Sequence, residues 1–254
     1  MSAIAQPAVH SSWRSYVQEA KCEALQKLRE PAYCLPVIGF PVLFYLLFGV
    51  LLDKGEGKAA QYLLATYGAF GVIGAGLFGF GVSIAVDREK GLLRLKRALP
   101  VPPGALLLAR MAMAMLFAAI ISLVLAVIAA TVAGVALEPS QWIRLFVINV
   151  LGVLPFCAIG LFVGSVVGGS AAPALLNMLY LPMAFLSGLW LPLTLLPGFL
   201  STIAPAWPAY HLGQLALKVV GFDAGQPIGM HVGVLAGITL LFFVLAQRRL
   251  SAAE

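Results

Sequence analysis

The chain has 254 residues, of which 61% are hydrophobic and 10% are charged, and its formal net charge is +6 at pH 7. Soluble globular domains carry about 25% charged residues, so this composition excludes that class. The charged residues are absent from long stretches rather than thinned evenly, and these long apolar runs differ from the short alternating segments of a transmembrane barrel. The sequence therefore predicts an all-α polytopic membrane protein.

The N-terminal part contains an amphipathic segment over residues 10–30. Apolar residues such as Trp13 and Leu28 recur there at three- and four-residue spacing, charged residues fill much of the remainder, and Pro31 closes the run. A helix of this kind, placed before a first span, is expected to lie along the inner membrane face. Residues 1–33 are therefore predicted to form a cytosolic amphipathic connecting helix, with a solvated leader helix of no special role as the alternative.

Residues 34–254 are predicted to form one transmembrane domain of six spans. A helix needs about 20 predominantly apolar residues to cross a hydrocarbon core of about 30 Å. The six runs that meet this requirement lie near 34–52, 62–86, 105–134, 142–166, 170–191 and 228–247.

Glycines are frequent in the second run and recur in the fourth. Residues 74–79 match the dinucleotide-binding pattern G-x-G-x-x-G by letters alone, because the strand and the βαβ context that the pattern needs are missing. Small residues at helical spacing, as also at Gly164 and Gly168, more often allow a second helix to approach closely. We therefore expect helix contacts here rather than a nucleotide site.

Prolines interrupt the chain between the fifth and sixth runs. Four of them fall between Leu191 and Pro208, and a helix cannot run straight through so many. The segment is nevertheless too apolar for a plain solvated loop, and broken backbone at membrane depth persists only where protein covers it or where it lines a cavity. Residues 192–225 are therefore predicted to form an extracytoplasmic re-entrant segment of short helices.

The cations are distributed unequally between the two sides of the predicted bundle. With six spans, twelve of the sixteen Lys and Arg lie on the side of the two termini and four lie on the other. The positive-inside rule makes the richer side cytoplasmic. We expect a multi-pass protein of the cytoplasmic (inner) membrane with both termini in the cytosol. The basic surplus then lies beside anionic lipid headgroups, so it does not indicate a nucleic-acid partner.

A charged hairpin connects the second and third runs. Six of the sixteen Lys and Arg lie between Asp87 and Arg110, and the prolines from Pro100 onward end the helical pattern. A short cytosolic helix over residues 87–100 is predicted, whose leucines contact the membrane domain and whose cations remain available to a soluble partner. Plain positive-inside anchoring is the alternative.

Two other kinds of function remain open. One is an ATPase-independent secondary transporter or membrane scaffold. Ion-coupled transporters usually need an ionisable residue within the membrane, and every Asp and Glu here falls in a predicted loop, flank or terminus, which weakens this interpretation without excluding it. An intramembrane hydrolase would use Ser187 and His231, although Phe185 stands where the first Gly of its turn should be. The chain has no G-x-x-x-x-G-K-[ST] motif, so any ATP that drives it must be bound by another polypeptide. Its cysteines show no spacing typical of a metal site.

The hairpin resembles the membrane subunits of type-2 ATP-binding-cassette (ABC) exporters. Their pattern is a Glu, a Gly two residues on, a Leu-rich stretch, a proline turn and a cation that opens the third span. The matching residues are Glu89, Gly91, Leu95, Pro100, Pro103 and Arg110. The segment from Phe185 to Pro192 is similar to the family's region between spans five and six, whereas Ala204-Pro205 stands where the family often has an aromatic or Asn-Pro pair.

This resemblance implies a permease subunit, not itself an enzyme, that exports a drug, lipid or glycan-like substrate. ATP and Mg²⁺ would bind to a separate ABC ATP-binding subunit, so no cofactor or metal is expected in this chain. A second copy of the chain or a paralogous permease would complete the membrane part. The residues implied in contact with the ATPase are Glu89, Gly91, Arg94, Lys96 and Arg97 in the hairpin, with Arg14 and Lys21 on the inner-face helix.

Overall fold

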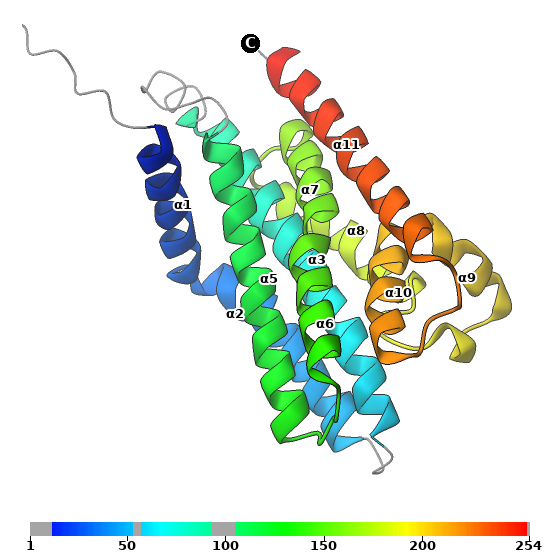
Figure 1. Cartoon of the computed structure of the whole chain (residues 1–254). Coiled ribbons are helices and arrows are strands. Elements are labelled where there is room, and N and C mark those ends of the chain that lie inside the picture. The colour runs from blue at the N-terminus through cyan, green and yellow to red at the C-terminus, as the bar shows by residue number, and fades with distance from the viewer. Residues whose placement is uncertain (1–11, 53–56, 93–104, 253–254) are drawn as a thin grey trace, which may run out of the picture.

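The computed structural model describes residues 12–52, 57–92 and 105–252, with the side chains of 12–16, 105–106 and 251–252 outside the description. Within these ranges every regular element is a helix and no strand occurs, which confirms the all-α prediction. The long helices pack into an elongated bundle, as Figure 1 shows.

The elements follow one another in a simple order. They are α1 (Ser12–Leu28), α2 (Pro31–Phe44), the π-helix η1 (Tyr45–Leu51), α3 (Lys58–Glu89), α5 (Ala105–Thr131), α6 (Pro139–Gly152), α7 (Leu154–Val166), α8 (Ala172–Leu186), η2 (Leu193–Leu195), α9 (Gly198–Ile203), η3 (Ala204–Ala206), α10 (Pro208–Val220) and α11 (Ile228–Ala252).

Five helical stretches of the described part are long and apolar enough to cross a membrane. They are Pro31–Leu51, Lys58–Glu89, Leu107–Thr131, Pro139–Val166 and Ile228–Leu250. The remaining predicted span, 170–191, corresponds to α8, which has 15 residues and ends where Gly188 takes a φ of +75°. This helix is shorter than the roughly 20 residues of an ordinary crossing. The structure thus supports a multi-pass membrane protein, and the sixth span stays a prediction.

The central helix of the bundle is α3. It contacts α2, α5, α6, α7, α8 and α10, and most of its residues are buried. The predicted close approach of helices is confirmed between α3 and α7. A Cβ atom at Gly160 would lie 2.8 Å from the carbonyl oxygen of Leu77, and one at Gly164 would collide with the carbonyl oxygen of Gly81. Only glycine lets the two backbones come this close.

Two buried tyrosines attach neighbouring helices to α3. The Tyr33 hydroxyl of α2 donates to the carbonyl oxygen of Ala75 at 3.2 Å, and the Tyr180 hydroxyl of α8 donates to that of Phe70 at 2.9 Å. Each bond gives a buried hydroxyl a partner in apolar surroundings, where an unpaired one is costly. The helices flanking α3 are therefore held in register along its length.

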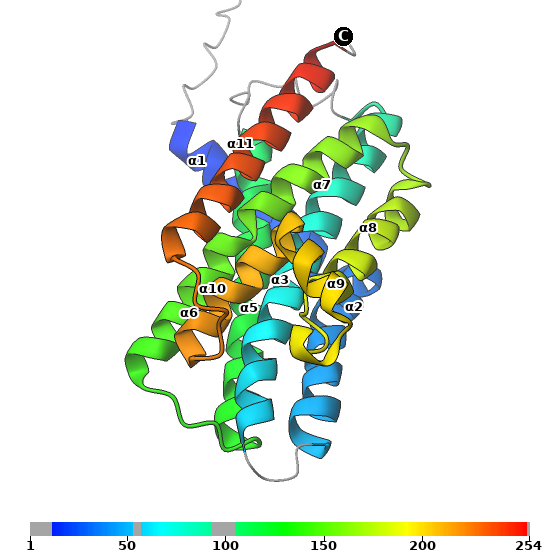
Figure 2. The same cartoon turned by 90° about the vertical axis from the view of Figure 1, so that its right-hand side faces the viewer.

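The chain between α8 and α11 consists of short helices, in agreement with its prolines. The helices η2, α9 and η3 have only three to six residues each. The longer helix α10 then packs against α3, α6 and α11 (Figure 2). Most side chains of α10 are buried by protein, so a position within the membrane is compatible with the fold. Entry of this segment into the membrane stays a prediction.

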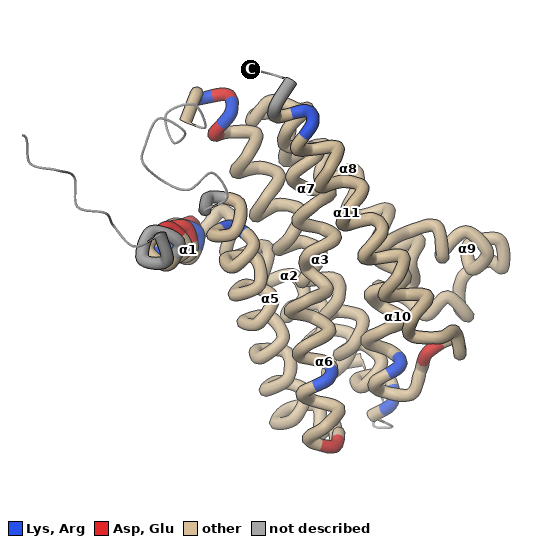
Figure 3. Tube along the Cα trace, turned by 45° about the horizontal axis from the view of Figure 1, so that its top comes forward, with Lys and Arg blue, Asp and Glu red and all other residues tan. Residues whose placement is uncertain are grey.

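Charged residues gather at the two ends of the bundle and are sparse between them, as Figure 3 shows. One end carries α1, the end of α3, the start of α5 and the end of α11. The other end carries Lys58, Glu138, Arg144, Lys218 and Asp223. This separation is what a bundle that crosses a bilayer requires, because charge at the centre of the hydrocarbon is expensive.

Candidate functional site

A buried arginine joins three helices at the end of the bundle that carries α1. Arg110 lies in the second turn of α5 and is only 2% exposed. Its Nη2 atom donates to Oδ2 of Asp87, in the last turn of α3, and its Nε atom lies 3.5 Å from Oε1 of Glu23 on α1. A buried guanidinium is tolerated only with such partners, because its desolvation is otherwise uncompensated.

The end of α3 is also fixed to the loop between α7 and α8. Nη2 of Arg88 donates to the carbonyl oxygen of Val167 at 2.9 Å, and the backbone N–H of Gly169 donates to Oε2 of Glu89 at 2.6 Å. A Cβ atom at position 169 would lie 2.8 Å from that same oxygen, so glycine leaves the space for the contact. Two consecutive residues of α3 therefore hold the α7–α8 loop.

The predicted hairpin begins as a continuation of α3. Residues 87–89 form the last turn of this helix, and Gly91, with a φ of +70°, ends it before helical backbone resumes at Leu92. A positive φ strains residues that carry a Cβ, which explains a glycine here. The remainder of the predicted coupling helix, residues 93–100, lies outside the described residues.

The predicted contact residues are only partly placed. Glu89 and Gly91 lie together and exposed at the end of α3, and Lys21 is exposed on α1. The three hairpin cations Arg94, Lys96 and Arg97 and the side chain of Arg14 lie outside the description. The carboxylate of Glu89 also accepts the hydrogen bond from the Gly169 N–H. The predicted contact of Glu89 with an ATPase stays a prediction.

The partners of Arg110 were not foreseen from the sequence. Glu23 is one of the charged residues of the amphipathic segment, yet it is only 6% exposed and lies against α5. The available signal was Arg110 itself, because a cation at the start of a long apolar run needs an anion from another segment. This contact also shows that α1 packs on the membrane domain.

The residues of the hydrolase alternative do not form a catalytic pair. Nδ1 of His231 lies 2.9 Å from Nδ1 of His211, whose Nε2 faces the carbonyl oxygen of Pro205 at 2.9 Å. The Ser187 hydroxyl has no hydrogen-bond partner among the described residues. A nucleophile needs its base within hydrogen-bond reach, so the arrangement gives Ser187 no activating base. The described residues also contain no cluster of three or more potential metal ligands.

Comparison with known proteins identifies the family of the chain. The family model described as "ABC-2 type transporter" matches residues 18–220, which include most of α1, the Arg110 network and the α7–α8 loop. The chain is also similar to "Putative transport permease YvfS" of Bacillus subtilis (strain 168), with 25% identity over 234 residues that cover 91% of this chain and 94% of that protein. The chain belongs to the ABC-2 type transporter family.

Proposed function

We propose that this chain is the permease subunit of an ATP-driven exporter in the cytoplasmic membrane, with hydrolysis on a separate ATP-binding subunit. The observation that carries the proposal is the double attachment of the end of α3. Arg110 joins it to α1 and α5, while Arg88 and Glu89 join it to the α7–α8 loop. A force applied to the hairpin that follows α3 therefore reaches several helices at once.

The central position of α3 extends this connection through the bundle. The helix spans 32 residues and contacts helices on all sides. Packed helices with glycine contacts transmit displacement as rigid elements, because their interiors have few voids to absorb it. A partner that moves the hairpin would thus move the membrane-spanning part, which is what conversion of ATP hydrolysis into transport requires.

The orientation and the partners follow from charge and from the family. The end that carries α1 and Arg110 is assigned to the cytosol by the positive-inside rule, so a soluble ATPase has access to it. Exposed apolar side chains on α2 and α8, such as Phe40 and Met178, leave faces for lipid or for a second permease chain. The substrate is proposed as a drug, lipid or glycan-like molecule on the basis of the family alone.

Charge reversal in the hairpin tests the ATPase contact. Arg94→Glu and Arg97→Glu, each in a chain co-expressed with its ABC ATP-binding subunit, should reduce the ATPase that co-purifies and abolish ATP-dependent export. Arg144→Glu is the matched control, because Arg144 is an exposed cation at the opposite end of the bundle. Undiminished co-purification and export in the hairpin variants would refute the contact, and export without any ATPase would establish the secondary transporter instead.

Two substitutions of Glu89 separate direct contact from positioning. Glu89→Gln retains an oxygen that can accept the Gly169 bond but removes the charge, whereas Glu89→Ala removes both. If Glu89 acts by holding the α7–α8 loop, Glu89→Gln should export normally. Glu89→Ala should then still bind the ATPase while its export falls. A loss of ATPase binding in both variants would instead identify the charge as part of the contact.

A further inference from the structure

Two buried histidines connect α10 to α11, which pack against each other (Figure 2). His211 lies in the first turn of α10 and His231 in the first turn of α11, and they are only 3% and 1% exposed. Their Nδ1 atoms lie 2.9 Å apart. Among the described side chains, this is the only hydrogen bond between the two helices. The His211–His231 pair is therefore the polar contact that attaches the start of α10 to α11.

The backbone determines which nitrogen of each ring carries hydrogen. Nε2 of His211 lies 2.9 Å from the carbonyl oxygen of Pro205, and because this oxygen can only accept, Nε2 must donate. Nδ1 of a neutral His211 is then an acceptor, so the hydrogen of the 2.9 Å contact belongs to Nδ1 of His231. Nε2 of His231 is left without hydrogen. The neutral pair thus consists of two imidazoles in opposite tautomers.

This arrangement limits the number of protons that the pair can bind. A first proton goes to Nε2 of His231 and leaves the bond between the rings intact. A second proton can go only to Nδ1 of His211, and two cationic rings would then direct N–H groups at each other across 2.9 Å. Separated histidines, in contrast, each bind a proton below their ordinary pKa of about 6.5. Because the separated rings bind more protons, the contact is stable above this pH and is weakened as the pH falls below it.

The surroundings supply no free anion that would compensate a doubly charged pair. Tyr210 places its ring 5.4 Å from that of His211 and 6.1 Å from that of His231. The charged groups that act on His231 are Lys218 and Asp223, which form an ion pair with each other at 2.6 Å and so largely cancel. Of the other elements packed here, α7, α8 and η3 contain no charged residue, and the charged residues of α3 lie at its two ends. Helix α6 has only Arg144, which is exposed and bonds to Ser140.

The opposite end of α10 is attached by groups that do not titrate. Nε2 of Gln141 donates to the carbonyl oxygen of Val219 at 2.8 Å, and Nε2 of Gln61 donates to that of Val220 at 3.2 Å. We propose that the His211–His231 pair is a pH-sensitive contact, which holds the start of α10 against α11 near neutral pH and separates when acid gives each ring a proton. The amide bonds at the far end persist, so only the start of α10 moves. The proposed orientation of the chain adds only that this acid acts from outside the cytosol, and the contact itself does not depend on the proposed function.

Solid-state nitrogen NMR tests the pair directly, because the chain has only three histidines. The full chain with His10→Gln is labelled with ¹⁵N-histidine and reconstituted in lipid bilayers, so that only the two rings of the pair are observed. At pH 8, one ring should carry hydrogen on Nε2 and the other on Nδ1, and a cross-peak should join the two Nδ1 atoms. The second imidazolium should form at least about one pH unit below the ordinary histidine value of about 6.5, and the cross-peak should vanish with it. Two Nε2–H rings at pH 8, or a cross-peak that persists between two imidazolium rings, would overturn the proposal.

A matched variant tests the second proton by stability. His211→Gln retains a donor for Pro205 and an acceptor for His231 but cannot be protonated. Between pH 7.5 and 5.5, the equilibrium constant for unfolding in SDS should therefore rise about tenfold more in the unaltered chain than in His211→Gln, as one additional proton bound on unfolding implies. His10→Gln leaves the pair intact and should keep the steeper profile. Parallel profiles of the unaltered chain and His211→Gln would overturn the proposal, and if this variant does not fold, the NMR measurement on the intact pair decides.

Discussion

Removal of the Arg110 side chain should be among the most destabilising single changes at the α1 end of the bundle. Arg110→Met preserves much of the side-chain volume but leaves Asp87 without the guanidinium and removes the same cation from beside Glu23. These carboxylates are 17% and 7% exposed, so water can compensate only a small part of the loss. Breaking a buried ion pair from one side costs about 3–5 kcal/mol, chiefly through the charge that is left behind.

The matched control is Arg144→Met. Arg144 is exposed, and among the described residues it donates only to Ser140 of its own helix, with its Nε 3.2 Å from the Ser140 carbonyl oxygen. An exposed pair of this kind contributes at most about 1 kcal/mol. The two free energies of unfolding can be compared by SDS titration in mixed micelles, followed by far-UV circular dichroism. A cost for Arg110→Met no greater than that for Arg144→Met would refute the reasoning.

The same assay separates the cause of the loss. If the loss comes from the buried carboxylates that face the missing guanidinium, Arg110→Met combined with Glu23→Gln and Asp87→Asn should recover most of the lost stability, because the charges of all three residues are then gone. Arg110→Lys should have an intermediate effect, since one ammonium group lacks the fork with which the guanidinium reaches both partners. A triple variant as unstable as Arg110→Met would show that the arginine acts through packing instead.

Two further predictions concern the α3–α7 contact and the far end of the bundle. Gly164→Val should cost about 2 kcal/mol in the same titration, because its side chain would meet the backbone of Gly81. Gly233→Ala on α11, with open space around it, should instead stabilise the protein by about 0.5–1 kcal/mol. Equal effects of the two substitutions would contradict the close packing of α3 on α7. The hydrogen bond from Lys218 holds the pKa of Asp223 below its usual value, so its contribution to stability is present above about pH 3.9 and is lost as the pH falls further. The thermal midpoint of Asp223→Asn should therefore depend less on pH between about pH 5 and 2 than that of the unaltered chain, and parallel profiles would contradict this.

The apolar runs were sufficient to predict where the membrane helices lie but not how each one is interrupted. The fourth run, 142–166, reads as one span, yet the structure divides it into α6 and α7 around Val153. Pro155, which has no N–H, follows this break and gives its local cause. Composition alone does not show the division, because both halves are predominantly apolar. The first run is similarly continuous in sequence but changes from α-helix to π-helix at Tyr45.

The site was predictable only in its local part. The spacing of Glu89, Gly91 and Arg110 can be read from one segment of the chain, and the structure places the first two together at the end of α3. The partners Glu23 and Gly169 come from distant segments. Nothing in a single sequence pairs such residues, because the tertiary packing of α1 and of the α7–α8 loop decides which charges meet.

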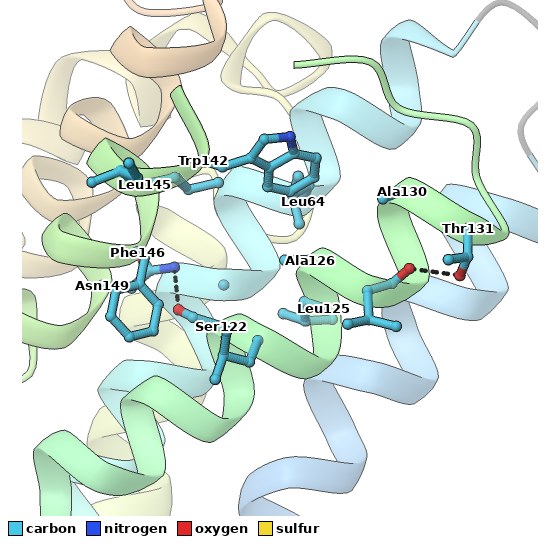
Figure 4. A pocket seen from close by; sticks show the side chains of 14 residues that line it. Leu64, Ser122, Leu125, Ala126, Ala130, Thr131, Trp142, Leu145, Phe146 and Asn149 are labelled. Atoms are coloured by element: carbon cyan, nitrogen blue, oxygen red, sulfur yellow. Dashed lines mark hydrogen bonds between the residues drawn. The ribbon is translucent and has the colours of Figure 1, made fainter. Parts of the chain in front are cut away.

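The coupling end of the bundle shares two helices with a cavity that is lined by α3, α5 and α6 (Figure 4). Arg110 fixes the start of α5 to the end of α3, and the far halves of these same helices form two walls of the cavity. The third wall, α6, is separated from α7 by the break at Val153. Because α3 is packed closely on α7 through glycine contacts and less extensively on α6, a displacement of α3 changes its position relative to α6 more readily than relative to α7. The cavity is therefore the part of the described membrane domain whose volume we expect to respond most to movement at the hairpin.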